Sequence, residues 1–145
     1  MGDRRLRAIK PPTYDAAETA GFYDERSGVF FSADCFGALM SEPARITADI
    51  RYDRLREGLV KWATVDAPWL HNITKASFAK ILNRVRDLAP KFILSSHLPP
   101  ADGMAEELLQ CFALAPSAEP FVCPDRQAFE AMRRGPAAAR LPSRM

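Results

Sequence analysis

Short apolar runs separated by turn residues fill the first third of the chain, a pattern that predicts β-strands. A first strand is expected around Leu6 and Ala8, because two consecutive prolines soon afterwards force an extended exit. Residues 20–23 and 29–32 are rich in aromatic and β-branched side chains, and the loop between them ends at Gly28. These two runs predict a β-hairpin. The second run has no polar alternation, so we expect both faces of that strand to be covered.

Apolar residues then recur at three- and four-residue spacing, which is the period of a helix. Tyr52, Leu55, Leu59 and Trp62 predict one buried helix face, and this helix should end before Pro68.

A second helix is expected from the N-cap residue Thr74, with an apolar stripe that runs from Phe78 to Leu88. Residues 91–96 then predict a short buried strand that ends at His97. Asp102 is expected to cap a third helix, and Phe129 with Met132 indicates a weak fourth one.

The order of strand, helix, helix, strand and helix predicts an α/β fold. We expect residues 1–134 to form a single domain and residues 135–145, rich in Ala, Pro and Arg, to form a flexible tail.

The composition of the chain indicates which partners and which cellular compartment are expected. The chain has 145 residues and a formal net charge of +2, and its basic residues do not gather into a stripe, so nucleic acid is not expected as a partner. No apolar run approaches the roughly 18 residues that a membrane span needs, so no membrane association is expected. Three cysteines, Cys35, Cys111 and Cys123, form no CxxC pair, which favours a reducing cytoplasm over a disulfide framework.

Three polar residues stand where apolar segments end: Asp15, Asp34 and His97. Carboxylates and an imidazole at neighbouring strand ends could bind Zn, Fe or Mn. Each also has a purely structural interpretation: Asp34 could cap a turn, His97 could be an ordinary loop histidine and Asp15 a surface acid. Their spacing alone does not decide between a metal site and these alternatives.

Two stretches of the sequence resemble the metallo-β-lactamase fold. Residues 19–37, TAGFYDERSGVFFSADCFG, resemble the hairpin that presents the bridging metal aspartate of that fold, and Asp34 matches this aspartate. Residues 91–100, KFILSSHLPP, resemble the strand and loop that bear the last metal histidine, which His97 matches. The branch that looks most similar contains the di-iron domains of flavodiiron oxygen and nitric-oxide reductases. Asp15 stands where that branch has a histidine ligand.

The resemblance implies the C-terminal half of an αββα metallo-β-lactamase sandwich, with one small mixed sheet flanked by helices. It implies a metalloprotein related to metal-dependent hydrolases or di-iron oxidoreductases, with Zn or Fe bound by Asp34, His97 and Asp15. The H-x-[HE]-x-D-H motif, which supplies most ligands in the first half of the fold, is absent from the sequence. The chain is therefore expected to be incomplete for catalysis by itself, and whether it is an enzyme stays open. The alternative is a non-catalytic interaction or remnant module without bound metal.

Partners follow from the same resemblance. A single sheet of the sandwich would leave apolar residues such as Val29, Phe31, Phe92 and Leu94 uncovered, so we expect self-association or a second chain that supplies the missing half. No flavin site is expected in this chain.

Two further residues could suggest chemistry but are expected to be structural. His71 has no partner ligand at a metal-binding spacing, and Cys35 lies next to a carboxylate, which disfavours a reactive thiolate. We therefore interpret His71 as structural and Cys35 as a packed core residue.

Overall fold

The computed structural model describes residues 3–134, which form one five-stranded sheet, four α-helices and three short 3-10 helices. The strands are β1 (Leu6–Ile9), β2 (Gly21–Asp24), β3 (Val29–Phe31), β4 (Phe92–Ser95) and β5 (Leu98–Asp102). The helices are α1 (Tyr52–Asp66), α2 (Lys75–Arg86), α3 (Ala105–Phe112) and α4 (Arg126–Arg134), with 3-10 turns η1 (Thr47–Asp49), η2 (Pro68–Asn72) and η3 (Ala115–Ser117).

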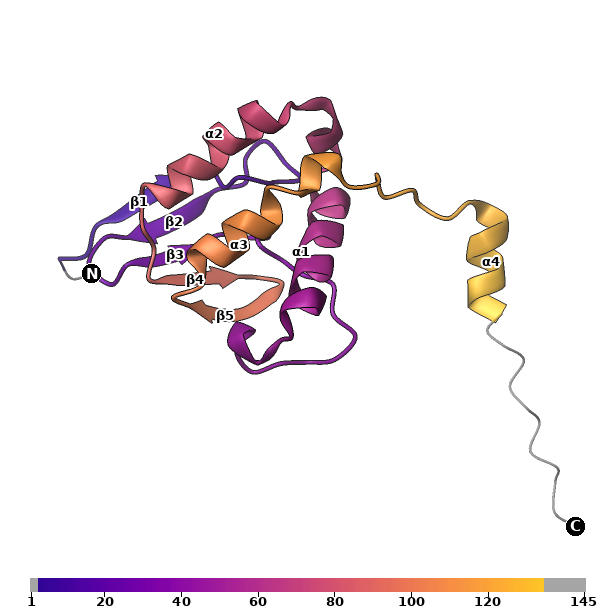
Figure 1. Cartoon of the computed structure of the whole chain (residues 1–145), viewed down its shortest axis with the longest axis horizontal. Coiled ribbons are helices and arrows are strands. Elements are labelled where there is room, and N and C mark those ends of the chain that lie inside the picture. Colours follow the sequence, from indigo (N-terminus) through magenta and orange to yellow (C-terminus); the bar gives the residue numbers. More distant parts are fainter. Residues whose placement is uncertain (1–2, 135–145) are drawn as a thin grey trace, which may run out of the picture.

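The strands follow the chain order β1-β2-β3-β4-β5 across the sheet (Figure 1). Every neighbouring pair is antiparallel except β3 and β4, which are parallel and are connected through α1 and α2. A parallel pair needs such a long crossover, because its strands must start at the same edge of the sheet. The mixed α/β fold predicted from the sequence is confirmed.

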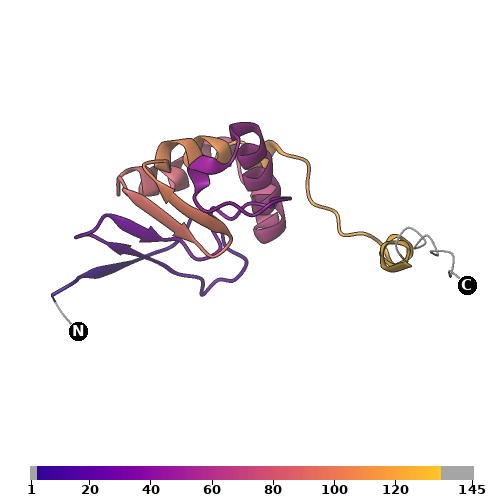
Figure 2. The same ribbon diagram turned by 90° about the horizontal axis from the view of Figure 1, so that it is seen from below.

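The helices α1, α2 and α3 lie on one face of the sheet (Figure 2). On that face Phe30 and Ile93 are fully buried, and they continue into the helix residues Leu55, Leu59 and Phe112. This layer of aromatic and aliphatic side chains is the core of the protein. Tyr52 begins α1 but does not share its buried face, since its ring is largely exposed.

No helix of residues 3–134 covers the opposite face of the sheet. The register pairs Phe22 with Phe31 and Val29 with Phe92 on this face, and Phe22, Phe31 and Phe92 are 46%, 43% and 37% exposed. The expectation that both faces of β3 are covered is therefore wrong within this chain. The absence of polar alternation instead produces an exposed apolar surface. We call this surface, formed by Phe22, Val29, Phe31 and Phe92, the open apolar face.

Local sequence signals explain the hairpin and the start of α2. Gly28 has a φ of 71°, so it supplies the left-handed conformation in the loop between β2 and β3. The Thr74 hydroxyl accepts a hydrogen bond of 3.1 Å from the Ser77 backbone N–H, which satisfies one free donor in the first turn of α2.

The strand β5 was not expected from the sequence, because it contains Pro99 and Pro100. It lies at the edge of the sheet, where prolines are tolerated since one side of the strand has no neighbour to bond. Asp102 ends this strand and pairs with Phe92, so the prediction that Asp102 caps α3 is wrong.

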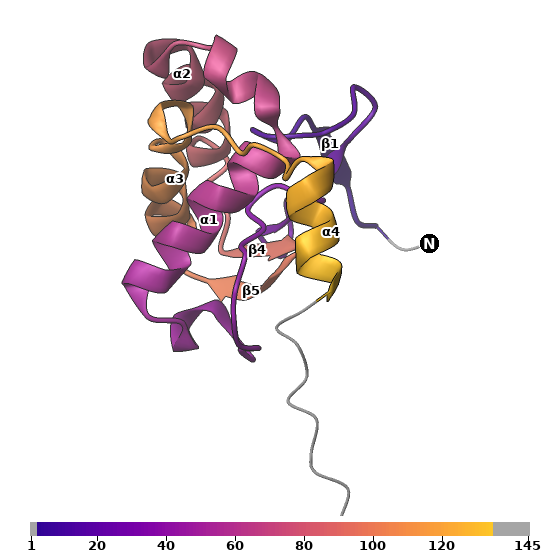
Figure 3. The same cartoon turned by 90° about the vertical axis from the view of Figure 1, so that its right-hand side faces the viewer.

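The helix α4 lies apart from the sheet and from α1 to α3 in Figure 1, and in Figure 3, viewed from that side, it lies in front of them. Its apolar residues Phe129 and Met132 are exposed. The tail expected at residues 135–145 lies outside the described residues. Among residues 3–134, no helix combines the length and the apolar character that a membrane span requires.

Candidate metal centre

Asp34 lies in a tight loop that follows β3. Two of its neighbours, Ala33 and Phe36, have positive φ values of 53° and 64°, a conformation that is uncommon for residues with a side chain. The Ser32 hydroxyl donates a hydrogen bond of 2.8 Å to the Cys35 carbonyl, and the Cys35 N–H donates to the Ser32 carbonyl. These bonds fix the loop so that the Asp34 carboxylate is only partly exposed.

His97 lies in the turn between β4 and β5 and meets Asp34 from the neighbouring strand. Its Nε2 lies 3.2 Å from Oδ1 of Asp34. Trp62 of α1 contacts both residues: its Nε1–H donates a hydrogen bond of 2.9 Å to the Asp34 carbonyl, and its ring lies 4.2 Å from the His97 ring, centroid to centroid. The indole therefore holds the backbone of one residue and the side chain of the other.

Gly37 is required by the position of this indole. A Cβ atom at Gly37 would lie 2.5 Å from Nε1 and 2.6 Å from Cε2 of Trp62, far inside contact distance. Only a residue without a side chain lets the loop approach Trp62 this closely.

Asp15 is brought to the same place by the loop between β1 and β2. The Lys10 ammonium donates to the carbonyls of Ala17 and Thr19 at 2.6 and 3.0 Å, which closes this loop. The Trp69 Nε1–H donates a hydrogen bond of 2.9 Å to the Tyr14 carbonyl and anchors the loop to η2.

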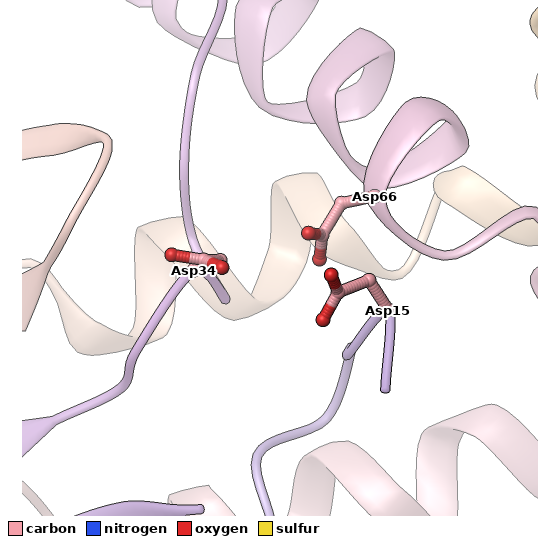
Figure 4. Close-up of side chains that lie close together, drawn as sticks. All are labelled: Asp15, Asp34 and Asp66. Carbon is pink, nitrogen blue, oxygen red and sulfur yellow. The ribbon is translucent and has the colours of Figure 1, made fainter. Parts of the chain in front are cut away.

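A third carboxylate, Asp66, completes the cluster (Figure 4). Each of Asp15, Asp34 and Asp66 has a carboxylate oxygen within 4.8 Å of those of the other two. Asp66 is the last residue of α1 and is only 8% exposed. Burial, followed by the charges of Asp34 and Asp15, raises the pKa of Asp66 to about 6, while His97 acts in the opposite direction.

Asp66 was not identified from the sequence, where it only marked the end of a helix. One signal was present. An acid in the last turn of a helix faces the negative end of the helix dipole, which disfavours it unless another role retains it.

Comparisons with known proteins identify solved structures with a similar fold. No protein-family model matches the sequence, and no curated protein matches it. Among solved structures, the flavodiiron protein from Giardia intestinalis is 20% identical with a TM-score of 0.63, and it covers 79% of this chain. Rubredoxin oxygen:oxidoreductase from Desulfovibrio gigas is 17% identical with a TM-score of 0.64, and it covers 83%. The chemotaxis sensor ODP in its peroxy diiron species is 18% identical with a TM-score of 0.58, and it covers 81%.

The chain has part of the metallo-β-lactamase fold of flavodiiron proteins. This confirms the fold that the two sequence stretches implied. The chain spans 27% of the Giardia structure, 30% of the Desulfovibrio structure and 47% of the sensor. It therefore corresponds to less than half of each of these metallo-β-lactamase-fold chains.

The structure brings together Asp15, Asp34 and His97, the three residues that were predicted from the sequence to bind metal. Their role as metal ligands stays a prediction. Asp15 and Asp34 belong to the carboxylate cluster, while His97 joins it through Asp34. The donor set suits one divalent cation, because it offers carboxylate oxygens, one imidazole and a buried Oδ2 of Asp66 without a hydrogen-bond partner in residues 3–134.

Cys35 and His71, which were expected to be structural, do not belong to the carboxylate cluster. Cys35 is fully buried, and burial raises the pKa of its thiol to about 12, so it is unsuited to act as a nucleophile. His71 lies in η2, outside the carboxylate cluster, and its buried Nε2 has no hydrogen-bond partner within residues 3–134.

Proposed function

We propose that this protein is a metalloprotein of the metallo-β-lactamase fold that binds a divalent transition metal ion, Zn or Fe, at Asp15, Asp34 and His97. The observation that supports it is the 3.2 Å contact between His97 and Asp34, which joins two segments separated by α1 and α2. Structurally similar proteins include flavodiiron proteins and a sensor with a diiron species, whose names indicate iron chemistry.

The surrounding residues prepare this site for a cation. Trp62 holds the Asp34 backbone and covers one face of the His97 ring, which limits the rotation of both potential ligands. Thr19 donates a hydrogen bond of 3.3 Å to Oδ1 of Asp15, so this carboxylate is also oriented. A divalent cation in such a site acts as a Lewis acid and lowers the pKa of bound water.

The chain alone offers donors for one cation. A dinuclear centre needs ligands on both sides of a bridging carboxylate, and the sequence has only one histidine beside Asp34. Metal-assisted hydrolysis or di-iron redox chemistry would therefore depend on ligands from elsewhere, and the chain by itself is incomplete for catalysis.

The open apolar face supports a partner that completes the sandwich. Phe22, Phe31 and Phe92 project from it without a covering layer in residues 3–134, and similar structures extend well beyond the part that this chain matches. We propose that a second sheet, contributed by another chain or segment, packs on this face. In its absence the exposed aromatic rings favour self-association.

Metal content tests the proposed function directly. The protein is purified without added metal or chelator and analysed by inductively coupled plasma mass spectrometry, with the Asp34→Ala variant in parallel. We expect a transition metal in the wild type and its loss in Asp34→Ala, because the variant lacks the carboxylate to which His97 is joined.

Asp87→Ala is the matched control. Asp87 follows α2 and is exposed, so this variant removes one aspartate carboxylate, as Asp34→Ala does, but away from the site. A folded wild type that contains no metal and takes up none on addition would contradict the proposal and favour the non-catalytic interaction module.

A further inference from the structure

We propose that Asp66 is itself a metal ligand, so that Asp15, Asp34 and Asp66 hold an oxophilic divalent cation such as Mn²⁺ through carboxylate oxygens. This inference rests on the proposed function, since it extends the same site by a residue and specifies the class of ion. His97 remains the single imidazole donor of the site, with its Nε2 3.2 Å from Oδ1 of Asp34.

The burial of Asp66 is the first argument. Its surface is 8% exposed, and Oδ2 has neither solvent contact nor a hydrogen-bond partner in residues 3–134. Removing a carboxylate oxygen from water without compensation is costly, so a buried carboxylate is ordinarily paired or coordinates a metal. Figure 4 shows the Asp66 side chain directed toward Asp15 and Asp34, where a cation would supply the missing partner.

The spacing of the oxygens is the second argument. One carboxylate oxygen from each of Asp15, Asp34 and Asp66 lies within 4.8 Å of the other two, and Oδ2 of Asp66 has no hydrogen-bond partner among residues 3–134. Oxygens bound to one ion at about 2.1 Å are separated by up to about 4.2 Å, so a small side-chain adjustment gathers them around a common centre.

The neighbouring charges are the third argument. Asp34 and Asp15 place two further carboxylates beside Asp66, and among residues 3–134 the basic side chain that pairs with this cluster is His97, 3.2 Å from Oδ1 of Asp34. The nearby ammonium of Lys10 is already engaged by backbone carbonyls of its own loop. A divalent cation is the group that would balance this excess of negative charge.

The donor set determines the class of ion. Three carboxylates and at most one imidazole make an oxygen-rich site, and carboxylate oxygens suit Mn²⁺ and Mg²⁺, whereas imidazole-rich or thiolate-rich sites suit Zn²⁺. Asp66 thereby shifts the site away from the histidine-rich composition that the sequence resemblance implied. Mn²⁺ is the appropriate probe because it can be counted by its paramagnetic resonance signal.

The test measures Mn²⁺ and Zn²⁺ binding to the metal-stripped full chain. Free Mn²⁺ is titrated by electron paramagnetic resonance and both ions by isothermal calorimetry, with wild type, Asp66→Asn, Asp34→Asn and the control Asp87→Asn. We expect one Mn²⁺ per wild-type chain, at least about tenfold weaker binding in Asp66→Asn, and no change in Asp87→Asn. Asparagine has the shape of aspartate, and circular dichroism is used to check that each variant is folded.

Different outcomes separate the two proposals. If Asp34→Asn loses the ion but Asp66→Asn binds it like wild type, the proposed metal site stands and the role of Asp66 is wrong. If wild type binds Zn²⁺ but no Mn²⁺, the proposed class of ion is wrong. If wild type binds neither ion nor contains iron on purification, the proposed function itself fails.

Discussion

Replacing Asp66 with asparagine should stabilise the metal-free protein at neutral pH. The pKa of Asp66 is raised from 3.8 to about 6, mainly by burial and then by the charges of Asp34 and Asp15. Each pKa unit corresponds to about 1.36 kcal/mol, so the ionised carboxylate opposes folding by up to about 3 kcal/mol. Asp66→Asn removes this charge and leaves a side chain of similar volume.

The sign of the pH dependence follows from proton uptake. Between pH 3.8 and about 6 the folded protein holds a proton on Asp66 that the unfolded chain has released, so stability falls as pH rises through this window. Below the window Asp66 is neutral in both states, and the advantage of the variant disappears. Above it the advantage is complete.

The assay is urea unfolding followed by circular dichroism in the presence of EDTA, at several pH values from 4 to 7.5. Other carboxyl groups, such as Glu57 and Glu106, have lowered pKa values and titrate in both proteins, so their contribution cancels in the difference between variant and wild type. Asp87→Asn, which alters an exposed carboxylate away from the site, is the control. A variant less stable than wild type at pH 7.5, or a difference independent of pH, would refute the reasoning.

Three further predictions concern the loop, the thiols and the open face. Gly37→Ala should destabilise the fold by about 1–3 kcal/mol, because its Cβ displaces the Trp62 indole; urea unfolding with tryptophan fluorescence checks this, and unchanged stability and emission would contradict it. A thiol reagent should modify the exposed Cys123 rapidly and the buried Cys35 only after unfolding; rapid reaction of Cys35 in the native state would be inconsistent with its environment. Wild type should elute larger than 16.1 kDa in size-exclusion chromatography with light scattering and Phe31→Lys nearer to that mass, whereas a monomeric wild type would argue against a sticky open face.

Local signals were sufficient for most elements of the fold. Gly28 predicted the hairpin loop, and Thr74 predicted the start of α2, since each acts through backbone groups only a few residues away. The strand β5 was missed because Pro99 and Pro100 argue against a strand unless it lies at a sheet edge. Edge position is a property of the whole sheet, which no local window contains.

The residues of the candidate site also fall into those that the sequence predicted and one that it did not. Asp34 and His97 were found because each lies beside a stretch that resembles a known fold, and the structure places them 3.2 Å apart. Asp66 was missed because its importance depends on its burial and on its distance to Asp15. Asp15 precedes β2, and Asp66 ends α1, so the two residues are far apart in the sequence. Neither quantity is encoded in the residues adjacent to Asp66.

The two edges of the sheet differ in how they could recruit another strand. Pro99 and Pro100 have no N–H group, and the Pro99 carbonyl already accepts a hydrogen bond of 2.6 Å from the Thr47 hydroxyl, so β5 offers little to an incoming backbone. The strand β1 at the opposite edge contains no proline and is largely exposed. A further strand can therefore be added to the sheet at the β1 edge but not at the β5 edge. A peptide fused for strand complementation should be attached where it can reach β1.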